Sequence, residues 1–380
     1  MKPVIWEYLD AADAEAITAC LREWRQLGPD LGVLALASEQ EPAAVAALQQ
    51  AANQLGMPLA GAVVPGLIAG GSFRRHGVLL LALDAATPQA IVPLARGGAH
   101  TDDAAVAELA AFIEAHAGED DDDTLLLFVD GMTPDVSSLL DRLYLTVGNR
   151  VRYAGSNVGS ESFRPVPCLF DNARFMGGAA LALLLPRHPG AALAHRYGEA
   201  ESLSVATSSH GNRVASIDGL PAFEAYQELI ARTHGVALTR ENFYQHVVHF
   251  PLALHLAEGE PLVRIPVAVD DDGSLYCVGE VPEAALLSIV EAAPPGSAET
   301  ARAVAAGVRA HHPAAVLAFG CAGRLMHQGE AAAVLEFAEL QAALAPAPVF
   351  GALSLGEIAN YEGQGYPRFH NATLVALPWR

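Results

Sequence analysis

The chain has 380 residues, enough for two or three domains, and a formal net charge of −21, which disfavours binding to nucleic acid or to anionic lipid surfaces. Hydrophobic residues make up 52% of the chain and charged residues 17%, which excludes an intrinsically disordered protein. The apolar stretches reach only about half of the ~20 residues that a membrane helix requires, and the first residues lack the pattern of a secretory signal. We therefore expect a cytoplasmic protein without membrane insertion.

One arrangement occurs three times along the chain: an apolar strand, a helical stretch, and a second strand that ends in small residues and glycine. The three copies span residues 31–66, 124–159 and 315–356. Short apolar runs that alternate with helices are typical of strands buried on both faces. The sequence therefore predicts an α/β fold in which repeated strand-helix-strand units form mixed sheets.

Further strand-like segments lie around these units. Turn residues at 208–212 and 270–273 join several of them, which indicates antiparallel additions to the sheets. A helix begins after a loop near residue 220, and we place a domain boundary just beyond that point. The first predicted domain, 1–225, then holds two repeat units, and the second, 226–380, holds the third.

The spacing of cysteine and histidine indicates no metal site. No two cysteines have C-x-x-C spacing, so we expect four free thiols. His246 and His249 lie at the start of a predicted strand, whose apolar segment is 247–252, and residues three apart in a strand face opposite sides of the sheet. The cysteines are Cys20, Cys168, Cys277 and Cys321.

Complete catalytic signatures are missing from the sequence. It contains no Walker phosphate loop, no H-E-x-x-H helix and no G-x-G-x-x-G between a strand and a helix. Residues 352–356 around Ser354 resemble a nucleophile elbow, but a loop composition follows where an elbow has a helix. We do not expect an enzyme, and a hydrolase that uses Ser354 stays the alternative.

The densest polar cluster lies near the C-terminus, where three segments follow or precede apolar strands. Ligands of α/β sheets bind in the crevice beyond the strand ends, and glycines there let backbone groups approach them. Arg324 is the expected ligand contact, because its planar fork suits the carboxylate of an amino acid or a small organic acid. In the alternative interpretation, Arg324 and Glu357 form a structural ion pair. The predicted site comprises Arg324, Glu357, His370 and Asn371, with the backbones of Cys321, Gly323 and Gly356.

These residues also carry a resemblance that covers nearly the whole chain. Residues 319–324, 351–358 and 370–373 resemble, in order and spacing, the Cys-x-Gly-Arg, Gly-Glu-Ile and His-Asn-x-Thr phrases of the FIST family. The N-terminal half resembles the family more loosely, at residues 61–66, 129–131 and 155–157. The resemblance implies an N-terminal and a C-terminal FIST domain, with Gly61, Gly155 and Ser156 as further ligand-binding candidates.

The resemblance also implies a function. FIST proteins are bacterial sensory modules for small ligands, so we expect a ligand-binding protein in signal transduction. No kinase or cyclase segment is apparent, which implies that a separate protein carries the output. Some members of the family are assigned as haem-based gas sensors, and a non-covalent haem that senses nitric oxide is a further alternative, because 14 histidines are present without a C-x-x-C-H motif.

Overall fold

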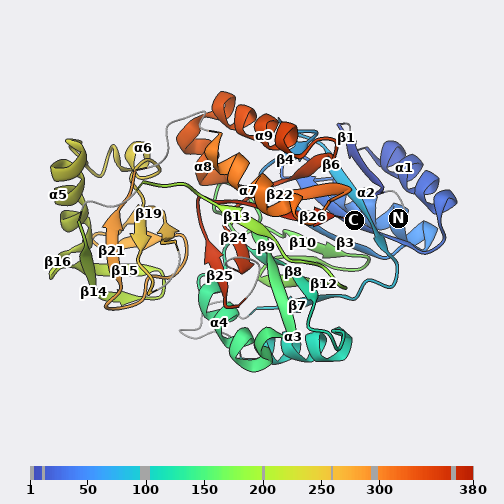
Figure 1. The fold of residues 1–380 in the computed structure, drawn as a ribbon, viewed down its shortest axis with the longest axis horizontal. Coiled ribbons are helices and arrows are strands. Elements are labelled where there is room, and N and C mark those ends of the chain that lie inside the picture. The colour runs from blue at the N-terminus through green and yellow to red at the C-terminus, as the bar shows by residue number, and fades with distance from the viewer. Residues whose placement is uncertain are drawn as a thin grey trace.

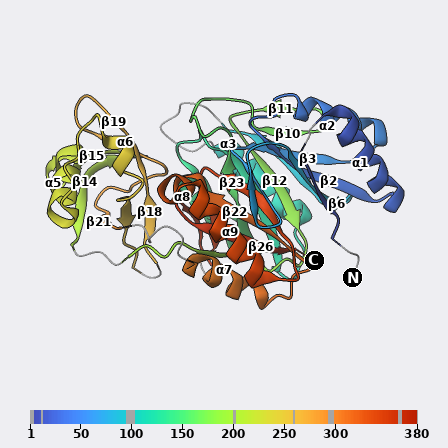
Figure 2. The same ribbon diagram turned by 90° about the horizontal axis from the view of Figure 1, so that it is seen from above.

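The computed structural model describes residues 4–10, 13–94, 103–198, 202–257, 260–291, 298–360 and 365–379. These residues form a larger and a smaller lobe, and both chain ends lie in the larger one (Figures 1 and 2). The described part of the chain holds no helix that is long and apolar enough to cross a membrane.

Three repeats build the larger lobe, each with the order strand, helix, strand, helix, strand, hairpin, strand, except that the third has two consecutive helices, α8 and α9, between its parallel strands. The first comprises β1 (Trp6–Leu9), α1 (Ala14–Leu27), β2 (Leu31–Ser38), α2 (Ala44–Leu55), β3 (Leu59–Val64), β4 (Leu67–Ala69), β5 (Ser72–Arg74) and β6 (Val78–Asp84). The second comprises β7 (Gln89–Pro93), α3 (Asp103–His116), β8 (Asp123–Asp130), α4 (Val136–Val147), the 3-10 turn η1 (Gly148–Arg150), β9 (Val151–Val158), β10 (Leu169–Asp171), β11 (Phe175–Met176) and β12 (Ala179–Leu185). The third comprises β13 (Ala192–Ala194), α7 (Glu299–Arg309), β22 (Ala315–Cys321), α8 (Ala322–Gln328), α9 (Glu330–Leu344), β23 (Val349–Ser354), β24 (Glu357–Asn360), β25 (Pro367–His370) and β26 (Leu374–Trp379).

The predicted strand-helix-strand units are confirmed, because β2 with β3, β8 with β9, and β22 with β23 each form a parallel pair. Each pair is the centre of a six-stranded mixed sheet. The hairpins are exchanged between the repeats: β4–β5 joins β23, β10–β11 joins β3, and β24–β25 joins β9. The three sheets are therefore interlocked, and each repeat completes the sheet of another.

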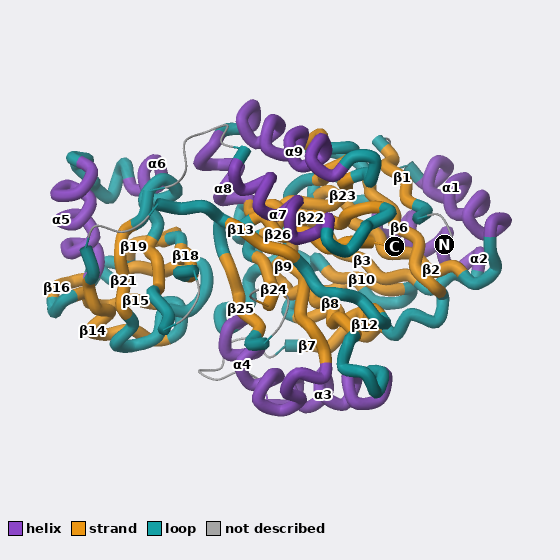
Figure 3. Tube along the Cα trace, in the orientation of Figure 1, coloured by secondary structure: helices purple, strands orange, loops and turns teal. Residues whose placement is uncertain are grey.

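The central core lies where the inner faces of the three sheets meet. Phe128 of the second repeat packs edge-to-face on Phe319 of the third, with ring centroids 5.7 Å apart, and Trp6 stacks on Phe350. Helices cover the outer faces: α1 and α2 on the first sheet, α3 and α4 on the second, α7 and α9 on the third (Figures 1 and 3).

A glycine recurs in the second strand of each parallel pair for a steric reason. A Cβ atom at Gly155 would lie 1.9 Å from the carbonyl oxygen of Leu127 on the neighbouring strand, and one at Gly351 would lie 1.8 Å from that of Ala318. Both glycines also have a positive φ, which side chains rarely adopt. Gly61 is the equivalent residue of the first repeat, and its Cβ would lie 2.5 Å from a carbonyl oxygen. Close backbone approach therefore explains this recurring glycine.

The smaller lobe is inserted into the third repeat, between β13 and α7 (Figure 1). It has its own apolar core and a sheet in which β15 pairs with β20, so segments on both sides of the predicted 225/226 boundary share one sheet. It comprises β14 (Ser204–His210), β15 (Arg213–Ile217), β16 (Leu220–Pro221), α5 (Ala222–His234), α6 (Phe243–His246), β17 (Leu252–Leu254), β18 (Leu262–Arg264), β19 (Pro266–Val269), β20 (Leu275–Cys277) and β21 (Leu286–Ile289).

The strand predicted at 247–252 is wrong. The backbone there continues the turn of α6, since the N–H of Val247 donates to Phe243 and that of His249 donates to His246. This turn buries Val247 and Val248 in the core of the smaller lobe, and the strand β17 begins only at Leu252.

Candidate functional site

The carboxyl ends of the parallel strands converge at the lobe junction. Three backbone hydrogen bonds of 2.8–2.9 Å join the ends of β3, β9 and β23: Gly159 N–H to Val63, Asn157 N–H to Gly356, and Leu353 N–H to Gly66. In sheets with parallel strands, this is the edge where ligands bind. The end of the third pair, where Cys321 is in register with Ser354, contacts the smaller lobe.

A cavity of about 50 Å³ lies between the lobes at this end, and we name it the interlobe cavity. Gly323 lets the lobes approach, because a Cβ atom there would lie 2.6 Å from Cδ1 of Ile265. The larger lobe lines the cavity with Glu161, Phe163, Cys321, Ala322, Gly323, Met326, Ser354, Leu355 and Asn371, and the smaller lobe with Tyr244, Val247, Val248, Ile265, Pro266, Val267 and Val278. Three predicted site residues, Cys321, Gly323 and Asn371, therefore share one cavity.

The carboxylate of Glu357 lies buried behind the cavity wall. It accepts hydrogen bonds from the hydroxyl groups of Ser354 and Thr373, and from the N–H of Thr373 at 3.2 Å. Burial raises the pKa of Glu357 to about 7, although hydrogen bonds from Ser354, Thr373 and Cys321 act in the opposite direction. Glu357 can therefore gain or lose a proton near neutral pH.

A polar row crosses three strands at this position. Ser156, Glu357 and His370 are directly opposite one another on β9, β24 and β25, which places their side chains on one face of the sheet. Ser156 Oγ and His370 Nε2 are buried without a hydrogen-bond partner among the described residues. Burial lowers the pKa of His370 to about 3, so the ring is neutral. Asn157 Oδ1 is a third buried atom without such a partner.

Asn371 lines the interlobe cavity with a side-chain amide that has one hydrogen-bond acceptor still available. Its Nδ2 donates to the carbonyl oxygen of His370 at 2.6 Å, whereas its Oδ1 is buried without a partner in the described part of the chain. A buried acceptor left unsatisfied costs about 1–3 kcal/mol, and a donor on a ligand would remove that cost. Asn371 is therefore the group in this wall best suited to orient a ligand.

The predicted pairing of Arg324 with Glu357 is wrong. Arg324 forms its ion pair with Glu336 of α9, because that carboxylate faces α8 while Glu357 turns towards Ser354 and Thr373. All five N–H donors of Arg324 have partners within the protein. The acceptors are Glu336, the hydroxyl of Thr300, and the carbonyl oxygens of His195 and Ala372. Arg324 does not line the interlobe cavity and braces the structure behind it.

The remaining predicted glycines lie where neighbouring atoms leave no room for a side chain. Gly61 lies within β3, where a Cβ atom would be 2.2 Å from the ring of Phe170, and the structure does not bring it to the interlobe cavity. Gly155 precedes Ser156 in the middle of β9. Gly356 has a φ of +130°, and its Cβ would lie 2.3 Å from the ring of Phe369. Close packing accounts for all three glycines.

Ser354 does not have the surroundings of a nucleophile elbow. Its hydroxyl donates to the carboxylate of Glu357, and the strand β24 follows it where an elbow has a helix. Haem does not fit the interlobe cavity, which measures about 50 Å³ and has no histidine among its described lining residues.

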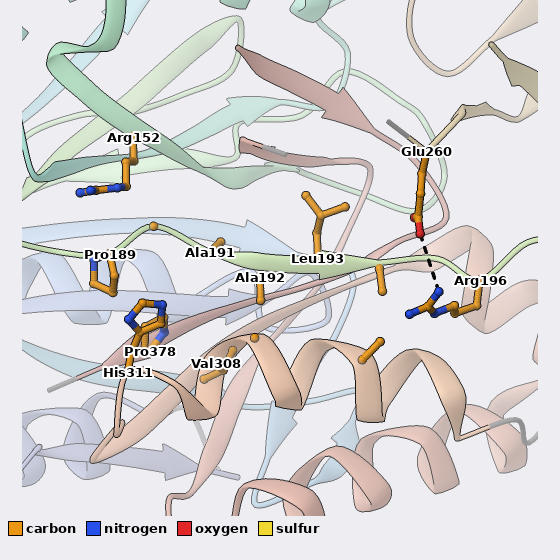
Figure 4. A pocket seen from close by; sticks show the side chains of 14 residues that line it. Arg152, Pro189, Ala191, Ala192, Leu193, Arg196, Glu260, Val308, His311 and Pro378 are labelled. Atoms are coloured by element: carbon orange, nitrogen blue, oxygen red, sulfur yellow. Dashed lines mark ion pairs between the residues drawn. The ribbon is translucent and has the colours of Figure 1, made fainter. Parts of the chain in front are cut away.

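A larger groove of about 390 Å³ lies on the outer side of the larger lobe, between residues 189–196 and α7 (Figure 4). Its floor consists mainly of small apolar side chains such as Ala192 and Val308, and its Arg196 forms an ion pair of 3.8 Å with Glu260. None of the predicted site residues lines this groove.

The sequence missed the smaller lobe's contribution to the cavity. Ile265 and Val267 lie in the apolar run 263–269, which predicts a strand but no ligand contact. Val248 lies in the segment 247–252, whose predicted strand is wrong. The contact of His249 with His327 was also missed: Nδ1 of His249 lies 2.5 Å from Nδ1 of His327 on α8, across the lobe junction.

Comparison with known proteins identifies the family of the chain. None of the curated proteins compared with the chain matches it. The family model of the FIST N domain matches residues 30–220, and that of the FIST C domain matches residues 222–360. FIST domains are associated with sensory proteins that bind small ligands. The two matches together cover most of the sequence, and the chain belongs to the FIST family.

Proposed function

We propose that this FIST protein is a sensory protein that binds a small molecule in the interlobe cavity. The observation that carries the proposal is the Oδ1 of Asn371, which is buried without a partner among the described residues, in a largely apolar wall between two lobes. Ligand sites are typically such apolar cavities at domain junctions, with a few polar groups that fix the orientation of the ligand.

The lining indicates the chemistry of the ligand. Val248, Ile265 and Val267 offer apolar surface, and Asn371 Oδ1 offers a hydrogen-bond acceptor. Of the two expected ligand classes, an amino acid with an apolar side chain suits this wall better than an organic acid. Its ammonium group can donate to Asn371, and an organic acid has no such donor. The carboxylate of either class cannot use Arg324, whose donors have protein partners.

The size of the cavity implies movement. About 50 Å³ holds a few water molecules but no amino acid, so the lobes must separate to admit the ligand. We propose that this change in lobe arrangement is the signal, which a separate protein reads in the cytoplasm. A ligand that binds one arrangement better than the other shifts their populations by its difference in affinity.

Mass spectrometry of compounds that co-purify with the protein tests this function. Ala322→Phe fills the interlobe cavity, and the matched control Ala303→Phe fills the outer groove of Figure 4. We expect wild type and Ala303→Phe to retain the same small molecule and Ala322→Phe to lose it. Equal retention by both folded variants, or no retained compound in wild type, would contradict the proposal.

A further inference from the structure

A second cavity, of about 350 Å³, lies at the lobe junction beside the N-terminal end of α4, and we name it the α4 cavity. This volume is within the range of small-molecule sites, roughly 300–1,000 Å³. The α4 cavity shares no lining residue with the interlobe cavity. It therefore requires an explanation of its own.

Arg264 of β18 lines this cavity and is only 2% exposed. Its Nε donates to the carbonyl oxygen of Glu280, and its Nη1 donates to those of Val263 and Phe369, at 2.9–3.1 Å. Its Nη2 has one long contact, 3.4 Å to Ser137 Oγ, which leaves a donor of the guanidinium unused among these contacts.

The guanidinium of Arg264 forms no direct ion pair with a carboxylate of the described residues. Burial lowers its pKa to about 10, and the charge of Glu280, which lies beyond ion-pair distance, acts in the opposite direction. A buried charge without a direct ion pair is costly, so an anion supplied by a ligand would stabilise this arrangement. The unused donor at Nη2 marks where an oxygen of that anion would bind.

The first turn of α4 completes the polar end of the cavity. Glu280 of the smaller lobe accepts hydrogen bonds from the N–H of Ser138 at 3.1 Å and from its hydroxyl, so this helix end already binds one carboxylate. Burial raises the pKa of Glu280, which weakens its repulsion of a second anion. Asp141 and Arg368, of opposite charge, also line the cavity.

The other walls of the α4 cavity are apolar. Leu254 and Leu262 of the smaller lobe are buried there, and Phe369 of β25 lies under the guanidinium of Arg264, 5.8 Å from ring centroid to Cζ. These side chains can hold a short hydrocarbon chain, because burial of each CH₂ group between them favours binding.

We propose that the α4 cavity binds a small aliphatic carboxylate, with an oxygen on Arg264 Nη2 next to Ser137 Oγ and its hydrocarbon chain against Leu254 and Leu262. This site is additional to the interlobe cavity and does not depend on the function proposed above.

Isothermal titration with butyrate, and with the neutral isostere butyramide, tests the site. We expect wild type to bind butyrate at least roughly tenfold more tightly than butyramide, because only the anion pairs with Arg264. Ser137→Ala should weaken butyrate binding several-fold, and Arg264→Gln should abolish it. The control Arg196→Gln, in the outer groove, should bind butyrate as wild type does.

Equal binding of butyrate and butyramide would overturn the proposal, as would unchanged butyrate binding by Ser137→Ala. Ser137 is not among the buried residues of α4, so Ser137→Ala should fold. This variant therefore tests the site even where Arg264→Gln fails to fold. Ala322→Phe should leave butyrate binding unchanged, which separates this test from that of the interlobe cavity.

Discussion

Arg324 and Arg264 are both at most 5% exposed and both donate to carbonyl oxygens at the lobe junction, yet only Arg324 has a carboxylate partner. Arg324 holds α8 against α9 through Glu336, and all its donors are used. Arg264 lines a cavity and retains an unused donor. A buried arginine that is fully paired stabilises the fold, whereas one that is incompletely paired beside a cavity is a candidate for ligand binding.

The largest expected effect is on the paired arginine. Glu336→Gln leaves the charge of Arg324 buried without a counter-ion and should lower the free energy of unfolding by about 3–5 kcal/mol. The matched control is Glu339→Gln on the same helix, which breaks the exposed pair with Arg302 and should cost less than about 1 kcal/mol. Urea denaturation measures both variants, and equal losses would show that Arg324 is not a brace.

A smaller effect is expected at the unpaired arginine. Arg264→Met removes hydrogen bonds to carbonyl oxygens but breaks no ion pair with a carboxylate. We therefore expect the free energy of unfolding to fall by about 2 kcal/mol. The same denaturation experiment applies. A loss as large as that of Glu336→Gln would remove the distinction between the two arginines.

Glu357 is a buried acid that forms no ion pair with a cation of the described residues, and it extends the comparison to a carboxylate. Because the pKa of Glu357 is raised in the folded state, the protonated carboxyl group favours folding. This contribution to the free energy of unfolding is complete below the pKa of the unfolded state and is lost as the pH rises through about 7. The free energy of unfolding should fall by about 1 kcal/mol between pH 6 and pH 8 from this group alone. Glu357→Gln should abolish this part of the pH dependence, and an unchanged profile would place the titration elsewhere.

The smallest effect concerns the histidine pair across the junction. Burial, followed by the charges of His327 and His246, lowers the pKa of His249, so the folded state disfavours its protonation. Contact between the lobes should therefore weaken as the pH falls below about 6.5. Small-angle scattering at pH 7.5 and pH 5.5 should show the lobes separating at the lower pH, and His249→Phe should reduce the change. Identical scattering at both values would contradict this role.

Local patterns predicted the repeats well. Each parallel pair was visible as two apolar runs around a helix, because strands buried on both faces need continuous apolar sequence. The exchange of hairpins between sheets was not visible, since residues 67–74 and 349–354 pair across most of the chain and no local pattern encodes that pairing. The insertion of the smaller lobe into the third repeat was not visible either, because it also depends on contacts between segments far apart in the sequence.

The site was predicted in part. Cys321, Gly323 and Asn371 meet because strand ends bring them together, which chain direction alone suggests. The partner of Arg324 could not be chosen from sequence, because several acidic residues lie in the C-terminal segments and only the packing of α8 on α9 brings Glu336 to Arg324. Arg264 could have been noticed as a lone charge inside the apolar run 263–269, a pattern that often marks a functional residue.

Site-resolved alkylation of the cysteines tests the interlobe ligand site most directly. Cys321 lines that cavity, while Cys20 lies half-buried on α1 in the larger lobe, away from the cavity, and is the internal control. The protein is treated with N-ethylmaleimide, with and without its co-purifying small molecule, and its peptides are quantified by mass spectrometry. We predict that the bound molecule slows modification of Cys321 and leaves Cys20 unaffected. Equal modification of Cys321 in both samples would contradict a ligand between the lobes.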